Sequence, residues 1–226
     1  MNAGFVTGRD ATLIIDTGAN TLAARTIHGY AAAAAPANRV LVLNSEKHFD
    51  HIGGNGYFRE QGIDVYGHAG IERTEDEFRC EMAEFNAAIG HRGRRAAEEE
   101  QAFYFDTRLA NPNRRISSET TLELGECAVQ VLLTPGHTAT NISVYVPEDG
   151  VLFCGDCLTH RYIPNLEAGT RVDWVQWLAS IDRIAALHPS AIVCGHGPVA
   201  TGAEVDDIIE SVRRILRKAL EGGHVW

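Results

Sequence analysis

One short segment constrains the fold of this chain more than any other, because it places four metal-ligand side chains directly after an apolar run. The run covers residues 40–43, and the segment that follows contains Glu46, His48, Asp50 and His51. Alternate side chains of an extended chain share one side, so the first three point the same way, and a turn at Asp50 would bring His51 to them. Imidazole and carboxylate groups are common ligands of zinc. We therefore expect a metal site at a strand end, with enough donors for two adjacent ions.

Three further ligand-type residues follow short apolar runs and adjoin glycine: His137 in TPGHT, Asp156 in CGD and His196 in CGHG. Glycine lets the backbone turn sharply, so the neighbouring side chain can point inward from a loop. Seven candidates at strand ends, which a sheet gathers along one edge, predict a dinuclear centre. A lone histidine is more often a surface or core residue. That interpretation applies to His28, His91, His188 and His224.

Short apolar and β-branched runs predict at least one large sheet. The expected strands are residues 11–15, 40–43, 63–66, 128–133, 142–146, 151–154 and 191–194. Helical periodicity covers residues 20–35 and 71–101, the second with a break near Gly90. The polar stretch 111–118 is the expected linker between two halves that share one sheet sandwich.

Two later apolar stripes have helical spacing, and we expect both to pack against a sheet and to have no other function. The first stripe follows an expected helix cap at Asp173. Its members are Trp174, Leu178, Ile181 and Ala185. The second comprises Val205, Ile208, Ile209, Val212, Ile215 and Leu216.

The bulk composition narrows the classes of partner and compartment. A chain of 226 residues that is 45% hydrophobic fits one domain over residues 1–226. A net charge of -10, from 30 acidic and 20 basic residues, argues against nucleic acid or an anionic membrane as a partner. Residues 1–10 have the pattern of neither a secretion signal nor a membrane anchor, which indicates a cytoplasmic protein.

Five scattered cysteines do not suggest a disulfide framework, and Cys154 and Cys157 are expected to be buried thiols rather than a redox pair.

With these motifs in this order, the sequence resembles the metallo-β-lactamase superfamily. The resemblance runs from LIIDTG at residues 13–18, through residues 46–51 and GHT at 136–138, to GD at 155–156 and GHG at 195–197. It implies an α/β fold, the four-layered αβ/βα sandwich, with a dinuclear site along one edge of its two sheets. It also implies that Asp16 supports the metal loops without ligating, a plain turn carboxylate being the alternative.

The usual motif of that family is H-x-H-x-D-H, and here Glu46 replaces the first histidine. The resemblance implies a first ion bound by Glu46, His48 and His137, a second bound by Asp50, His51 and His196, and Asp156 as the bridge between them. Glutamate reaches about as far as histidine and supplies an oxygen donor, so the replacement does not require loss of the site. Zinc is expected, with manganese or iron as alternatives that hard oxygen ligands favour. The competing interpretation of Glu46 is a surface carboxylate beside a mononuclear site.

The expected function is that of a metal-dependent hydrolase in which a metal-bound hydroxide attacks a carboxylic ester, lactone or amide, β-lactams included. Asp50 would orient the hydroxide and transfer a proton to the leaving group. The alternatives are a phosphodiesterase, an iron-dependent redox enzyme of the same superfamily, and a noncatalytic binding protein. A homodimer is also expected. The candidates for contact with a small-molecule substrate, surface packing being their alternative role, are His160, Arg161, Tyr162 and Asn165.

Overall fold

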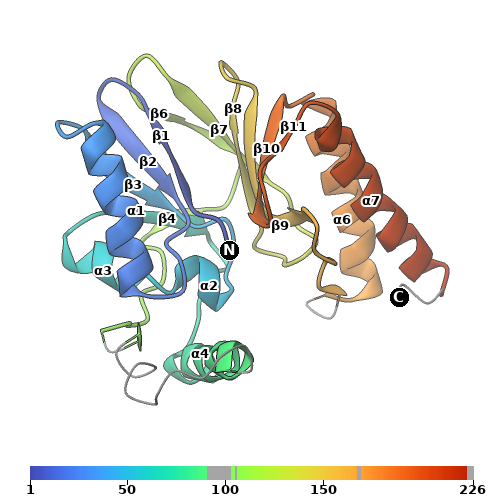
Figure 1. The fold of residues 1–226 in the computed structure, drawn as a ribbon, viewed down its shortest axis with the longest axis horizontal. Helices are drawn as coiled ribbons and strands as arrows, with labels where there is room; N and C mark the ends of the chain where they lie inside the picture. Colours follow the sequence, from blue (N-terminus) through green and yellow to red (C-terminus); the bar gives the residue numbers. More distant parts are fainter. Residues whose placement is uncertain (91–102, 105, 167–168, 223–226) are drawn as a thin grey trace. The chain divides into compact units, whose positions relative to one another are not determined.

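The computed structural model describes residues 1–90, 103–104, 106–166 and 169–222. They form two compact units, one of residues 3–115 and the other of residues 1–2 and 116–226 (Figure 1). The boundary falls between residues 115 and 116, within the stretch 111–118 predicted as a linker, but residues 114–116 of that stretch form a strand of the first sheet rather than a plain linker. A single domain over residues 1–226 stays a prediction.

The first unit is built on a five-stranded sheet of order β1-β2-β3-β4-β5. Its antiparallel pair β1–β2 is followed by parallel neighbours β3 and β4. Alanines of α1 and Phe58 of α3 pack against Ile14, Val42 and Val65 of the sheet, which makes the core of this unit. The strands are β1 (Gly4–Thr7), β2 (Ala11–Ile15), β3 (Arg39–Leu43), β4 (Val65–His68) and β5 (Arg114–Ile116); the helices are α1 (Thr21–Ala34), α2 (Phe49–Ile52), α3 (Asn55–Glu60) and α4 (Glu75–Gly90).

The second unit is built on a six-stranded sheet of order β11-β10-β9-β8-β7-β6. Helices α6 and α7 lie side by side (Figure 1) and their apolar faces join the core formed by β9 and β10. Both predicted stripes therefore have the packing function expected of them. The strands are β6 (Thr120–Glu123), β7 (Ala128–Leu133), β8 (Ile142–Val146), β9 (Val151–Thr159), β10 (Ala191–His196) and β11 (Ala200–Thr201); the helices are α6 (Arg171–Ala186) and α7 (Ala203–Leu220).

Several predicted boundaries need correction. Strand β9 continues to Thr159 and β10 to His196, because irregularities in the β9–β10 register accommodate the CGD and CGH sequences that ended the apolar runs. Strand β4 lies two residues later than predicted, and four strands too short or too polar to stand out, β1, β5, β6 and β11, were missed. The N-cap of α6 is Thr170, with Asp173 as the reciprocal partner in a capping box. Predicted helix 71–101 begins at Glu75, and residues 91–101 lie outside the described part.

The state of the cysteines and the length of the helices bear on two expectations from the sequence, that there is no disulfide framework and no membrane anchor. All five cysteines are free thiols. Every helix in the described part of the chain is too short or too polar to cross a lipid bilayer.

Candidate metal centre

The motif segment of the first unit leaves β3 at Leu43 and enters the short helix α2 at Phe49. His48 is the last extended residue, with φ -66° and ψ 151°. The predicted turn is therefore real but begins one residue earlier, so that Asp50 and His51 both lie within α2. Helical geometry rather than strand alternation thus determines where the Asp50 side chain points.

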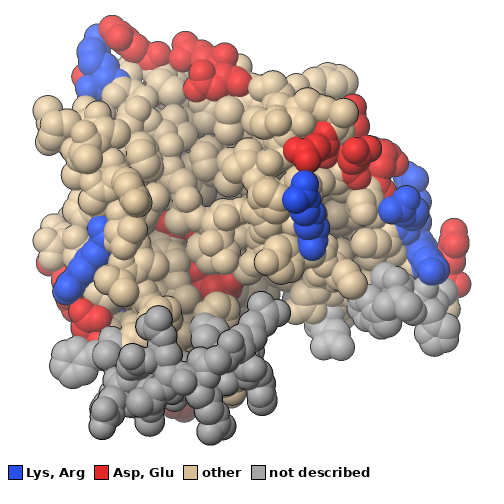
Figure 2. All heavy atoms as spheres, viewed as in Figure 1, with Lys and Arg blue, Asp and Glu red and all other residues tan. Residues whose placement is uncertain are grey.

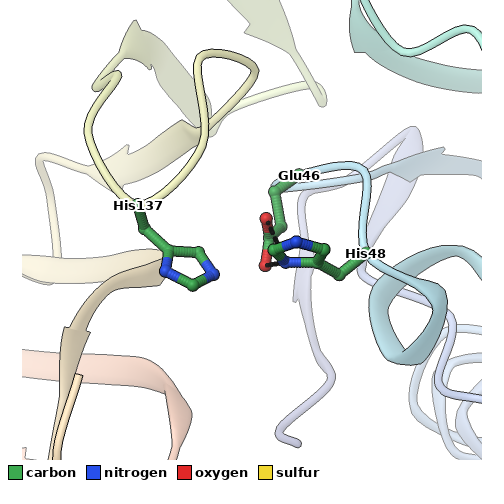
Figure 3. Close-up of side chains that lie close together, drawn as sticks. All are labelled: Glu46, His48 and His137. Atoms are coloured by element: carbon green, nitrogen blue, oxygen red, sulfur yellow. Dashed lines mark hydrogen bonds and ion pairs between the residues drawn. The ribbon is translucent and has the colours of Figure 1, made fainter. Parts of the chain in front are cut away.

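Glu46 is a buried residue, and its carboxylate faces the two histidines of the motif. One oxygen lies 2.9 Å from Nδ1 of His48, and the other lies 3.4 Å from Nε2 of His51. Figure 3 shows the Glu46 carboxylate beside the His48 ring. The side chain has no solvent exposure. The interpretation of Glu46 as a surface carboxylate is therefore wrong.

The orientation of His51 is fixed by Asp16, which follows β2. Oδ2 of Asp16 lies 2.9 Å from Nδ1 of His51, and Ser45 donates to the same carboxylate from its backbone N–H and its hydroxyl, both at 2.7 Å. The acceptor at Nδ1 places the ring proton there and leaves the lone pair of Nε2 for a metal. Asp16 adopts a left-handed backbone, φ 63°, which aspartate tolerates better than most residues. Asp16 has the contact expected of a supporting residue.

A buried polar network, for which the sequence contains no local signal, holds the backbone of the same segment. The carbonyl of His51 accepts from the hydroxyl of Thr17 at 3.0 Å and from the side-chain amide of Asn44 at 3.2 Å. Asn55 bonds to Asn44 and donates to the carbonyl of Ala110, and its Oδ1 lies 3.0 Å from the Thr17 hydroxyl, whose single proton is shared between Asn55 and His51. Such a satisfied network fixes the position of His51 within the unit.

The second unit gathers its three predicted ligands around one carboxylate. Oδ2 of Asp156 lies 3.6 Å from Nε2 of His137 and 3.5 Å from Nε2 of His196. His137 extends from the loop after β7, as Figure 3 shows, whereas Asp156 lies within β9 and His196 ends β10. The prediction that all three lie just past a strand is thus correct for His137 only.

Two glycines beside the predicted ligands allow close packing there. A Cβ on Gly195 would lie 1.9 Å from Oδ1 of Asp156, and one on Gly136 would lie 2.4 Å from the side chain of Trp177. The ring of Trp177 is 5.6 Å from that of His137, in an edge-to-face arrangement, and its Nε1 donates to the carbonyl of Cys157. Helix α6 thereby supports the His137 loop.

Three donor distances fit metal ligation, whereas the 2.9 Å between the Glu46 carboxylate and Nδ1 of His48 is the length of a hydrogen bond. The distances of 3.4, 3.5 and 3.6 Å exceed the usual length of a hydrogen bond from nitrogen to oxygen. They are close to the separation of about 3.3 Å that zinc bonds of 2.0–2.1 Å impose on two ligands of a tetrahedral ion. Each unit therefore presents imidazole and carboxylate donors in a pattern suited to a divalent ion.

The four predicted substrate residues differ in their contacts. His160 is buried, and its ring bonds to the carbonyl of Pro198 at 2.9 Å, as a packing residue does. Arg161 is exposed and forms a 3.6 Å ion pair with Glu204. Asn165 is exposed. Tyr162 is 62% exposed and its ring lies 6.1 Å from that of His196, so it alone combines exposure with a ring contact to a predicted ligand.

Cys154 and Cys157, on either side of Asp156, are fully buried. Burial raises the pKa of both thiols, since a thiolate there would lose its hydration. A raised pKa lowers the fraction of reactive thiolate, which agrees with buried thiols and not with a redox pair.

Comparison with known protein families shows to which family this chain belongs. The family model described as "Metallo-beta-lactamase superfamily" matches residues 2–196, more than half of the chain. This chain belongs to the metallo-β-lactamase superfamily. A metallo-beta-lactamase family protein from Thermus thermophilus has the same fold, with a TM-score of 0.68 and 24% identity over 98% of this chain and 76% of that one. The predicted family and the predicted α/β fold class are thereby confirmed.

Curated relatives in the superfamily match over parts of their length. A "Hydroxyacylglutathione hydrolase" from Rhodospirillum rubrum is 27% identical over 156 residues, which is 69% of this chain and 47% of that protein. A "Beta-lactamase-like protein 2 homolog" from Caenorhabditis elegans is 35% identical over 95 residues, 41% of this chain and 28% of that protein. The matched regions thus span less than half of these relatives.

Proposed function

We propose that this chain is a metal-dependent hydrolase whose seven motif residues bind two divalent metal ions. The ligands proposed are Glu46, His48, Asp50, His51, His137, Asp156 and His196. The observation that carries the proposal is the burial of Glu46 against two motif histidines, at the one position where the chain departs from the family motif. A buried carboxylate needs a paired or hydrogen-bonded partner or a metal, and both groups that face Glu46 are imidazoles, which are themselves common metal ligands.

The charge of the donors also supports cation binding. Asp16, Glu46 and Asp50 are all buried within the motif region of the first unit, and Asp16 and Glu46 both contact the single imidazole of His51. Burying several carboxylates costs much free energy unless a cation neutralises them. With Glu46 in place of histidine, the proposed ligand set has one more negative charge than the usual set. That excess favours divalent ions, and manganese or iron relative to the usual set, with zinc still our first choice.

Bound divalent ions would supply a Lewis acid for the substrate oxygen and lower the pKa of a water nucleophile. The residues of the chain then hold and move protons. Asp16 keeps the proton of His51 on Nδ1, which fixes the tautomer. We propose that Asp50, 12% exposed at its side chain, orients the water and carries a proton to the leaving group.

We propose a small molecule with an ester-type carbonyl as the substrate: a carboxylic ester, thioester, lactone or amide. The thioester is included because hydroxyacylglutathione hydrolases match this chain. Of the four predicted contact residues we retain Tyr162, because it is exposed beside His196. On the face drawn in Figure 2, described lysine and arginine side chains stand in small separate groups near acidic ones, which offers little support for a polynucleotide substrate.

A substrate panel tests the proposal. The purified protein is treated with a chelator, reloaded with zinc, manganese or iron(II), and assayed on a thioester, a lactone, a carboxylic ester, a β-lactam and a phosphodiester. We expect hydrolysis of a carbonyl substrate that is lost on chelation and restored by metal. Phosphodiester cleavage alone would overturn the substrate class, and chelator-resistant activity would overturn the metal dependence.

A further inference from the structure

Both peptide groups of His48 are held by side chains outside the motif. The carbonyl of Lys47, which belongs to the peptide bond before His48, accepts from Nη1 of Arg73 at 2.9 Å. The N–H of Phe49, which belongs to the peptide bond after it, donates to Oε2 of Glu81 at 2.9 Å. These two peptide planes define φ and ψ of His48, and therefore the direction in which its side chain leaves the backbone.

The two holding side chains are joined to each other. Nη1 of Arg73 lies 2.9 Å from Oε2 of Glu81, the oxygen that also accepts from Phe49. The Arg73 side chain is only 10% exposed and that of Glu81 29% exposed, so solvent screens this pair less than it screens surface pairs. The Arg73–Glu81 ion pair thus connects the two side chains that hold the peptide groups on either side of His48.

The rest of the structure keeps this ion pair in place. Arg73 exchanges two backbone hydrogen bonds of 2.9 Å with the side chain of Asn111, which fixes the start of its side chain. On the other side, Phe78 of α4 packs on Phe49 with ring centroids 5.0 Å apart. Helix α4 is therefore anchored to α2 by apolar contact, and Glu81 is presented to the motif segment on a rigid element.

We propose that Arg73 and Glu81 are positioning residues that hold His48 in its metal-binding orientation. The inference rests on the proposed function, in which His48 is a ligand, and goes beyond it because neither residue belongs to the motif. The contacts of both with this segment are made to its backbone, so both act through the backbone. Removing such a support weakens metal binding by about ten-fold or more in typical sites.

Four variants test the proposal: Glu81→Ala, Glu81→Gln, Arg73→Ala and the control Glu84→Ala. Glutamine can still accept from Phe49 but loses the ion pair, so it should restore part of the function. Glu84 is an exposed residue of the same helix and has the same charge as Glu81. Arg73→Ala separates positioning from charge, because loss of a positive charge alone would strengthen cation binding, whereas loss of positioning weakens it.

Two measurements are made on each variant: zinc affinity, by competition with a chromophoric chelator, and backbone hydrogen exchange of residues 46–52 in the protein as purified. We expect affinity about ten-fold weaker for Glu81→Ala and Arg73→Ala, intermediate for Glu81→Gln and unchanged for Glu84→Ala, with faster exchange of the segment in the first two. Unchanged exchange, or tighter zinc binding by Arg73→Ala, would overturn the positioning function. A parent protein that binds no zinc, manganese or iron would overturn the proposed function instead, while the exchange data would still test the contact.

Discussion

The carboxylate of Asp16 lies 2.9 Å from Nδ1 of His51 and leaves Nε2 of the same ring facing Glu46. In many metal sites a carboxylate bonds to one ring nitrogen of a histidine whose other nitrogen binds the metal. The carboxylate then fixes the tautomer and raises the basicity of the ligand nitrogen. In this chain the outer carboxylate, Asp16, follows β2, and the proposed ligand, His51, lies in α2. The ligand geometry of the motif therefore depends on a residue 35 positions earlier in the chain.

Replacing Asp16 by asparagine tests that dependence without changing side-chain shape. Asparagine also tolerates the left-handed backbone at this position, so the fold should be retained. It cannot accept from Ser45 and His51 as the carboxylate does, and we expect metal affinity to fall by about 10- to 100-fold. Chelator competition measures the affinity, with Asp10→Asn, at an exposed aspartate, as the control. Equal affinities in the two variants would contradict the tautomer argument.

Gly195→Ala should abolish the function of Asp156. Its new Cβ would lie 1.9 Å from Oδ1 of Asp156 and 2.9 Å from the backbone of Gly155, so the carboxylate must leave its present position beside His137 and His196 or the strand must shift. We expect a large loss of metal binding and of any chelator-sensitive activity. Gly29→Ala, in α1 with nothing within 4 Å, is the control and should stabilise the protein slightly, by about 0.5–1 kcal/mol. Full metal content in Gly195→Ala would show that Asp156 does not need its present position.

Stability should fall as the pH rises above about 8.5, the pKa of a cysteine in an unfolded chain. Burial raises the pKa of Cys154 and Cys157 in the folded state, so above that pH the unfolded state releases protons that the folded state keeps. The linkage then favours unfolding, and the contribution is fully present only below about pH 8.5. Thermal unfolding midpoints between about pH 7.5 and 10 should decline more steeply in the parent than in Cys157→Ala. Parallel slopes would contradict the prediction for Cys157.

Much of the fold could be predicted from the sequence because its strands are apolar and its helices amphipathic. β2, β7 and β8 begin and end where the residues predict, and the stripe from Val205 to Leu216 is the buried face of α7. The sequence predicts that β9 ends at residue 154, because Gly155 and Asp156 interrupt its apolar pattern. The strand continues through them, since a register irregularity accommodates both residues. Apolar periodicity does not encode such irregularities.

The candidate site, like the fold, could be predicted from the sequence only in part. The motif residues could be proposed as ligands because histidine and carboxylate spacing is a local signal, and Asp16 as a supporting residue because the resemblance covers it. The contacts of Asn55 with Asn44, and of Glu81 with the backbone N–H of Phe49, have no such signal, since they join residues 11 and 32 positions apart that belong to no motif of their own. Their function becomes visible only when burial and hydrogen bonds are known.

The most direct test of the account is elemental analysis of metal in the purified parent and in Glu46→Ala. We predict two ions per chain in the parent and about one in the variant, because Glu46 is buried against His48 and His51 and is proposed as a ligand. Two ions in both proteins would remove Glu46 from the ligand set. No metal in either protein would contradict the central claim that this chain is a metal-dependent hydrolase.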